Sequence, residues 1–214
     1  MPDENRVTFL IDGFNLYHSI KDGDRNDTRS LRWLDLMAMC RSCLPILGKD
    51  ACLQEVWYFS AYAEFLRSVK PQVVNRHRTY VAALESSGVR VSIGRFKEKD
   101  IWCSGCNRAL KAHEEKETDV AIAAKILELF HTDACDTVVL VSGDTDLLPA
   151  IRTAQRLFTE KEIVVAFPDK RANAQLRQAV PFSFKIRRER YARNQFPEEI
   201  QLASGRIVKK PAGW

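Results

Sequence analysis

The chain has 214 residues, of which 45% are hydrophobic, and a formal net charge of +5. A chain of this length and apolar content can bury a core of its own, so we expect one domain with an appendage rather than two equal domains. No apolar run approaches the roughly 18 residues that a transmembrane helix needs. The N-terminus also lacks the basic-then-apolar order of a signal peptide, which indicates a cytoplasmic protein without a membrane partner.

Strand-like and helix-like segments alternate along the chain, which predicts βαβ units and a mostly parallel sheet of about five strands. The expected elements, in chain order, are a strand at 7–11, a helix at 31–47 with Ser30 as its N-cap, a strand at 56–61, a helix at 71–86, a strand at 89–93, a helix at 114–130, a strand at 137–141, a helix at 147–158 and a strand at 162–167. Right-handed crossovers would place the helices on both faces of the sheet. The polar, turn-rich residues 22–29 predict a mobile loop near the functional end of the first strand.

The first strand ends in Asp12, which Gly13 follows. Ligands of open α/β sheets bind at the carboxyl ends of the strands, so Asp12 is a candidate metal ligand there. Asn15 adds a second polar group that could orient a bound water or a substrate phosphate. An Asp-Gly turn and a helix cap at Asn15 are the structural alternatives.

The fourth expected strand ends in a sharper signal, because Asp144 and Asp146 follow it two residues apart. This spacing concentrates negative charge that a hard divalent cation would offset. N-capping of the next helix by Asp144 or Thr145 is the alternative, and it explains one aspartate but not both. Asp119 precedes apolar residues of its helix, which places it near that helix's buried boundary.

Three segments resemble the NYN domains, a branch of the PIN-like metal-dependent nucleases: IDGFNLY, K-x-TDV and SGDTDLLPAI. The resemblance covers about residues 7–167 and implies a three-layer PIN-like, Rossmann-like α/β fold. It also implies that an acidic cluster holds Mg²⁺ or Mn²⁺ and hydrolyses RNA. The implied catalytic and metal-binding residues are Asp12, Asp119, Asp144 and Asp146, with Asn15 beside them.

This chemistry suits the residues, because carboxylate-held divalent ions neutralise a phosphodiester and acidify a bound water without a dedicated histidine base. We therefore expect a metal-dependent ribonuclease acting on single-stranded or structured RNA, with DNA not excluded as substrate. Two alternatives stay open: a catalytically inactive PIN-like RNA-binding or scaffold protein, and a metal-dependent phosphatase that uses the Asp144 and Asp146 pair. A homodimer also stays open.

The six cysteines favour free thiols or a metal site over a disulfide framework. Within an insertion at residues 100–114, Cys103, Cys106 and His113 offer three ligands for a structural Zn²⁺, against a free-thiol loop as the alternative. Cys40 and Cys43 fall inside a helical run, which predicts buried free thiols.

Basic and aromatic residues suggest a substrate surface around the expected acidic edge. We expect Ser142, Lys116, Arg76 and Arg95 to contact substrate. Aromatic residues divide into candidates for base stacking and candidates for the core: Tyr17 and Trp102 for stacking, and Phe14 for the core.

The division expected here is a nuclease domain at residues 1–186 followed by a basic C-terminal extension at residues 187–214. The extension contains seven Lys or Arg residues and three Glu residues. Its alternation around Ser204 and Gly205 predicts a β-hairpin that docks on the body or on a partner, with Trp214 as an anchor. A disordered basic arm that folds on RNA is the alternative.

Overall fold

A seven-stranded sheet organises the chain in the computed structural model, which describes residues 4–24, 30–103, 105, 107–202 and 204–214. The strand order is β4-β3-β2-β1-β5-β6-β7, and every neighbouring pair is parallel except β3 and β4. The strands are β1 (Asn5–Asp12), β2 (Ala51–Ala61), β3 (Arg90–Cys103), β4 (Arg108–Lys116), β5 (Thr137–Val141), β6 (Glu162–Phe167) and β7 (Phe182–Lys185). The predicted mixed α/β fold with a mostly parallel sheet is confirmed.

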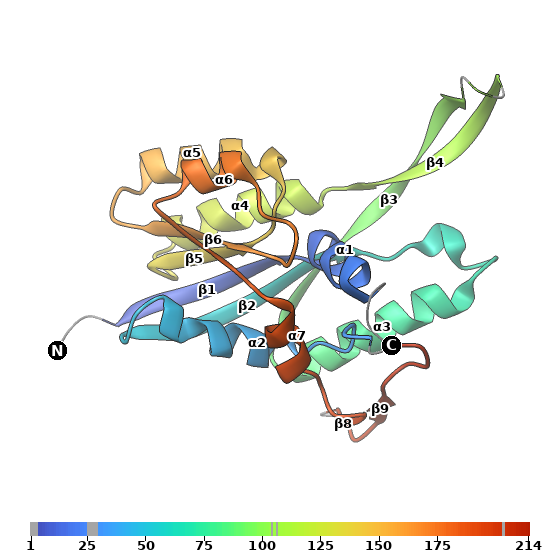
Figure 1. Ribbon diagram of the computed structural model, residues 1–214, viewed down its shortest axis with the longest axis horizontal. Helices are drawn as coiled ribbons and strands as arrows, with labels where there is room; N and C mark the ends of the chain where they lie inside the picture. Colours follow the sequence, from blue (N-terminus) through green and yellow to red (C-terminus); the bar gives the residue numbers. More distant parts are fainter. Residues whose placement is uncertain (1–3, 25–29, 104, 106, 203) are drawn as a thin grey trace.

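Helices cover both faces of this sheet (Figure 1). The helices are α1 (Gly13–Asp24), α2 (Leu36–Cys43), α3 (Pro71–Ser86), α4 (Thr118–His131), α5 (Leu148–Leu157), α6 (Ala174–Ala179) and α7 (Arg188–Arg193), with short 3₁₀ turns at η1 (Leu44–Ile46), η2 (Glu64–Leu66) and η3 (Thr145–Leu147). Side chains of β1 alternate between two apolar cores: Phe9 and Ile11 pack with α1, α2 and α3, whereas Leu10 packs with α4 and α5. These are the three layers expected of a parallel sheet buried on both sides.

The predicted helix at 31–47 was too long at its start. The helix begins at Leu36, where Asp35 rather than Ser30 is the N-cap and its carboxylate accepts the Ala38 N–H at 2.9 Å. The residues before it are not helical, and Trp33 among them is fully buried. Tertiary burial of this segment therefore overrides its local helical pattern.

The predicted helix at 114–130 was also wrong at its start, because residues up to Lys116 belong to β4. Strands β3 and β4 form an antiparallel hairpin that projects away from the body in Figure 1. Glu117, with φ of 79°, ends the hairpin and leads into α4. Of the predicted loop at 22–29, Asp22 to Asp24 are the last residues of α1, and residues 25–29 lie outside the described ranges.

The C-terminal extension packs on the body. Strands β8 (Glu199–Gln201) and β9 (Ile207–Lys209) form an antiparallel hairpin, as predicted. Tyr191, Phe196 and Val208 join the same apolar core as α1, α2 and α3. The ring of Trp214 lies 5.4 Å from that of Tyr80, centroid to centroid. The extension is therefore an ordered part of this core, and the alternative of a disordered arm is wrong.

Two smaller expectations are also resolved. Cys40 and Cys43 are buried free thiols, as predicted, and burial raises the pKa of each thiol. Among the helices of the described ranges, none has both the length and the apolar character that crossing a bilayer requires.

Candidate metal centre

Three of the four predicted aspartates meet at the carboxyl edge of the sheet. Asp12 ends β1, Asp144 follows the adjacent parallel strand β5, and Asp119 lies in the first turn of α4. One carboxylate oxygen from each of the three lies within 4.8 Å of the others. Asp146 is exposed and lies outside this acidic triad, although its backbone N–H donates to the Asp144 Oδ1 at 3.0 Å.

Hydrogen bonds fix the orientation of Asp12. Its Oδ1 accepts the Asn15 N–H at 2.9 Å, and its Oδ2 accepts the Ser142 hydroxyl at 2.8 Å. The Ser142 Oγ in turn accepts the Asp144 N–H at 3.0 Å, while the Asn15 Oδ1 accepts the Gly143 N–H at 3.1 Å. Ser142 and Asn15 thus link the two strand ends through hydrogen bonds. Ser142 is fully buried, and the substrate contact expected for it stays a prediction.

Two glycines allow the close approach of backbone segments at this edge. A Cβ on Gly13 would lie 2.7 Å from the Phe59 carbonyl oxygen, and one on Gly143 would lie 2.1 Å from the Arg171 carbonyl oxygen. Both contacts involve backbone, which cannot move aside cheaply. Any larger residue would therefore displace the turns that carry the triad.

The triad carries negative charge without basic compensation. Asp12 is only 4% exposed, and the loss of hydration raises its pKa to about 6 despite its two hydrogen bonds. Burial, followed by repulsion from Asp144 and Asp146, raises the pKa of Asp119. Within the described part of the chain, no Lys, Arg or His forms an ion pair with the three triad carboxylates. Converging carboxylates of this kind suit a hard divalent cation such as Mg²⁺ or Mn²⁺.

Sequence reasoning missed a fourth acid, Glu115 of β4. It is half-buried, its Oε1 accepts the Thr118 hydroxyl at 2.6 Å, and burial together with repulsion from Asp119 raises its pKa. Its charge also raises the pKa of Asp12. The signal that could have found it is period-two alternation in KAHEEK, which places every second side chain on one face of a strand.

Two of the residues predicted to bind substrate lie near the start of α4 and are exposed. Lys116 pairs with Glu114 at 3.0 Å, and Arg95 pairs with Glu117 at 2.7 Å. Exposed pairs of this kind are weak, so both cations can exchange their partner for a phosphate at little cost.

The remaining predicted side chains occupy three other places. Arg76 of α3 lines a cavity of about 230 Å³ beside α1. Phe14, which was expected in the core, is 46% exposed on α1 and lines the same cavity, as does Tyr17. Trp102, another stacking candidate, is 66% exposed near the tip of the β3–β4 hairpin.

The proposed zinc ligands are separated by the hairpin register. His113 pairs with Glu98, and Cys103 pairs with Arg108 five residues further along β3. Five strand residues span ~17 Å, which is beyond the reach of one ion. The His113 ring instead stacks on Phe65, with centroids 3.8 Å apart. Including His113 in the ligand set was therefore wrong, while the Cys103 side chain and Cys106 lie outside the described residues.

Comparisons with known proteins agree with this geometry. The fold is similar to the crystal structure of a protein of unknown function from Vibrio parahaemolyticus RIMD 2210633, with a TM-score of 0.59 and 16% identity, over 88% of this chain and 97% of the other. No curated protein matches the sequence significantly. The NYN domain family matches residues 6–186, which carry the whole acidic triad. The chain therefore belongs to the NYN domain family, within the PIN-like nuclease superfamily.

Proposed function

We propose that the protein is a metal-dependent ribonuclease that hydrolyses phosphodiester bonds of single-stranded or structured RNA. The observation that carries this proposal is the acidic triad, whose carboxylate oxygens converge within 4.8 Å without a basic partner among the described residues. Uncompensated acids at the ligand-binding edge of a parallel sheet are costly for folding, and a bound divalent cation would offset that cost. Membership of a nuclease superfamily that uses divalent metals supports the same assignment.

Asp12, Asp119 and Asp144 would hold the Mg²⁺ or Mn²⁺. When bound, such an ion neutralises the anionic oxygens of a phosphodiester and lowers the pKa of the attacking water. The hydrogen bonds from Asn15 and Ser142 keep Asp12 in one orientation, so little reorganisation is needed when substrate arrives.

Residues around the triad have supporting roles. Asp146 is exposed, and its charge helps to raise the pKa of Asp119, so it would accept a proton or a hydrogen bond from an incoming water. Lys116 and Arg95 flank the start of the helix that carries Asp119, and each can contact the phosphates of the strand next to the cleaved bond.

Cleavage of labelled single-stranded RNA in Mg²⁺ or Mn²⁺, with and without a chelator, tests this proposal. We expect Asp144→Asn to lower the rate at least about 100-fold, or ~2.7 kcal/mol of transition-state stabilisation. The matched control is Asp133→Asn, an aspartate at the opposite edge of the sheet that pairs with Arg6 and Lys161. It should cleave like the wild type.

Other outcomes separate the remaining readings. Cleavage that persists in chelator, or in Asp144→Asn at the wild-type rate, would exclude the triad as the catalytic centre. RNA binding without cleavage by the wild type would favour an inactive RNA-binding protein. DNA cleaved at the same rate as RNA would broaden the substrate class, and release of phosphate from a monoester alone would favour a phosphatase.

A further inference from the structure

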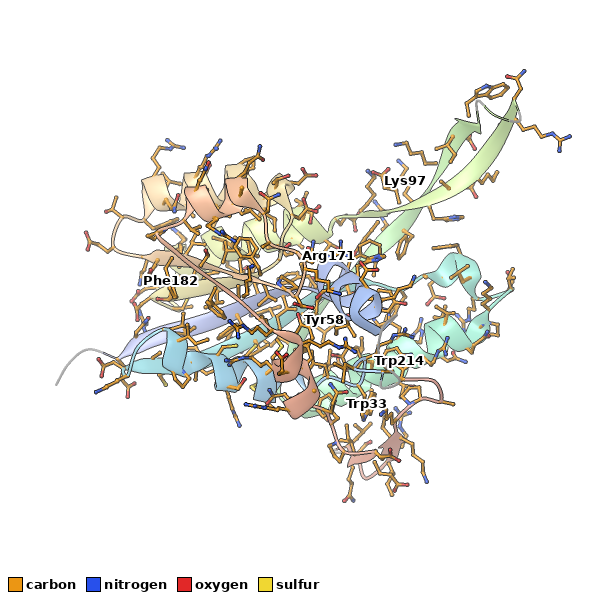
Figure 2. The ribbon with its side chains drawn as sticks, in the orientation of Figure 1. Trp33, Tyr58, Lys97, Arg171, Phe182 and Trp214 are labelled. Carbon is orange, nitrogen blue, oxygen red and sulfur yellow. The ribbon has the colours of Figure 1, made fainter. Side chains whose placement is uncertain are left out.

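A cavity of about 230 Å³ begins next to the end of β1 that carries Asp12. Its wall begins at Gly13, the residue after Asp12, and continues along Tyr58 and Ser60 of β2, the strand that pairs with β1 at this edge. Its other walls come from α3 and from Trp214. Figure 2 shows Tyr58 and Trp214 beside α1 and α3, on one side of the sheet. A substrate group bound there would lie next to a phosphate at the triad.

A second strand connects the cavity with the acids. Phe96 of β3 lines the cavity and pairs with Glu115 of β4, so the two side chains share one face of the hairpin. The charge of Glu115 in turn raises the pKa of Asp12, and the charge of Asp119 raises the pKa of Glu115. The cavity and the triad therefore adjoin each other along two separate elements.

Six aromatic rings line this cavity. The rings belong to Phe14, Tyr17, Tyr58, Tyr80, Phe96 and Trp214. Phe14 and Tyr17 are 46% and 39% exposed, and they lie three residues apart on one face of α1. Core packing does not explain exposed rings at the mouth of a cavity, whereas stacking of a planar ligand would cover them.

Polar groups also line the cavity, among them Tyr58, His77 and Arg76. The Tyr58 hydroxyl lies 3.5 Å from the His77 Nε2, and burial lowers the pKa of His77 to about 4, which keeps that imidazole neutral near pH 7. The pair offers donor and acceptor atoms to the edge of a heterocycle. Arg76 also lines the cavity and forms no ion pair with a carboxylate in the described ranges, so its charge is available to a phosphate.

We infer that this cavity binds one unstacked base of the RNA strand, from a nucleotide adjoining the cleaved phosphodiester; the inference rests on the proposed ribonuclease function. The volume is below the roughly 300 Å³ at which sites for drug-sized ligands begin, which suits a single base. A base inside a duplex cannot enter without leaving its stack. The substrate is therefore single-stranded RNA or an unpaired region of structured RNA.

Base binding can be measured apart from cleavage in the Asp144→Asn protein. The probe is a short single-stranded RNA that carries one fluorescent adenine analogue, whose emission changes on stacking. We expect Phe14→Leu or Tyr17→Leu to weaken binding about tenfold, because each variant removes one aromatic ring on which the base stacks. Both side chains are exposed, so the core should remain intact, and an unchanged melting temperature would show this.

Phe182→Leu is the matched control. Phe182 is 40% exposed and lies on β7 at the far edge of the sheet from α3, away from the cavity in Figure 2. Its affinity should equal that of the parent protein. A second control is an RNA with an abasic nucleotide at the stacked position, which the parent and the Phe14→Leu protein should bind equally.

The outcomes distinguish this inference from the proposed function. Cleavage by the wild type with equal RNA affinity in all aromatic variants would overturn the base cavity and leave the nuclease intact. If RNA binding depends on the aromatic residues but the wild type cleaves no RNA, the base-binding inference would stand and the proposed ribonuclease function would be wrong. Duplex RNA that competes as well as single-stranded RNA would also overturn the cavity.

Discussion

Acidic side chains gather at both ends of strands β1 and β5, in opposite electrostatic settings. At the amino ends, the Arg6 Nε donates to Asp136 at 2.9 Å, and the Arg6 Nη2 donates to Asp133 at 2.8 Å. Lys161 pairs with both of these aspartates. At the carboxyl ends, the acidic triad has no basic partner among the described residues.

The pKa values record the difference. The hydrogen bonds from Arg6 hold the pKa of Asp136 well below its usual range, whereas burial raises that of Asp12 to about 6. The amino edge therefore stabilises the fold through its charges, and the carboxyl edge destabilises it. A protein that pairs its acids at one edge and leaves them unpaired at the other retains the unpaired set for function, at a cost in stability.

The largest expected effect is on the free energy of unfolding of the metal-free protein, which should depend on pH through the buried carboxyl of Asp12. The pKa of Asp12 is about 6 when folded and 3.8 as the ordinary value, so between these values the folded state binds more protons than the unfolded state. The free energy of unfolding should therefore fall as pH rises from about 4 to about 6, by roughly 3 kcal/mol. Urea unfolding in chelator across this range measures it.

Asp12→Asn isolates the contribution of Asp12. An asparagine can still accept the Asn15 N–H and can donate to Ser142, so the variant should keep the fold and gain stability over the wild type near pH 7. Added Mn²⁺ should then stabilise the wild type far more than the variant. Parallel pH profiles for the two proteins would show that the buried charge is compensated by other means.

Strand-end aspartates were predictable because parallel strands of a βαβ unit end at one edge. Asp12 ends β1, and Asp144 comes shortly after the end of β5, so the hydrophobic periodicity of the two strands places both residues at the same edge. Asp119 required the family resemblance, since it lies at a helix start. The compensation of Asp136 was not predictable, because Arg6 comes from a position 130 residues earlier in the chain.

The predictions that were wrong have a common cause, which is contact between residues far apart in the sequence. Glu115 looked like part of a solvated helix, and only the β3–β4 hairpin shows that it belongs to a strand and faces Asp119. The helix expected from residue 31 starts at Leu36 because Trp33 before it packs under the C-terminal extension, where its Nε1 donates to the Pro197 carbonyl at 2.7 Å. Local propensity cannot reveal partners more than 160 residues away.

A smaller effect on stability is expected at the amino ends of β1 and β5. Asp136→Asn removes charge-assisted hydrogen bonds to Arg6 and an ion pair with Lys161. Because about a third of the Asp136 side chain is exposed, solvent screening limits the loss to about 1–2 kcal/mol. Urea unfolding at pH 7 measures this loss, and cleavage activity should stay at the wild-type level.

The pH dependence of the stabilisation by Asp136 should run opposite to that of Asp12. The folded pKa of Asp136 is depressed, so its stabilisation is present above the ordinary aspartate pKa of about 4 and is lost as pH falls below it. The wild type and Asp136→Asn should therefore converge in stability at acid pH. A loss of cleavage activity in this variant at temperatures where it is folded would contradict the division between the two edges.

The smallest expected effect tests whether the uncompensated negative charge of the acidic triad extends to Glu115. Glu115 is half-buried beside Asp119, and its charge should add to the attraction for a cation at the triad. Glu115→Gln should therefore weaken the apparent affinity for Mn²⁺ about fivefold, or ~1 kcal/mol, and leave the rate at saturating metal unchanged. Metal titrations of the cleavage rate measure both quantities.

Glu114→Gln is the control, because the Glu114 carboxylate is exposed and pairs with Lys116. It should leave metal affinity unchanged, since the removed charge is solvated and already compensated. A loss of a hundredfold or more in Glu115→Gln would make Glu115 a direct ligand, and the centre would then hold its ion with four carboxylates. Equal affinities in the two variants would confine the uncompensated charge to Asp12, Asp119 and Asp144.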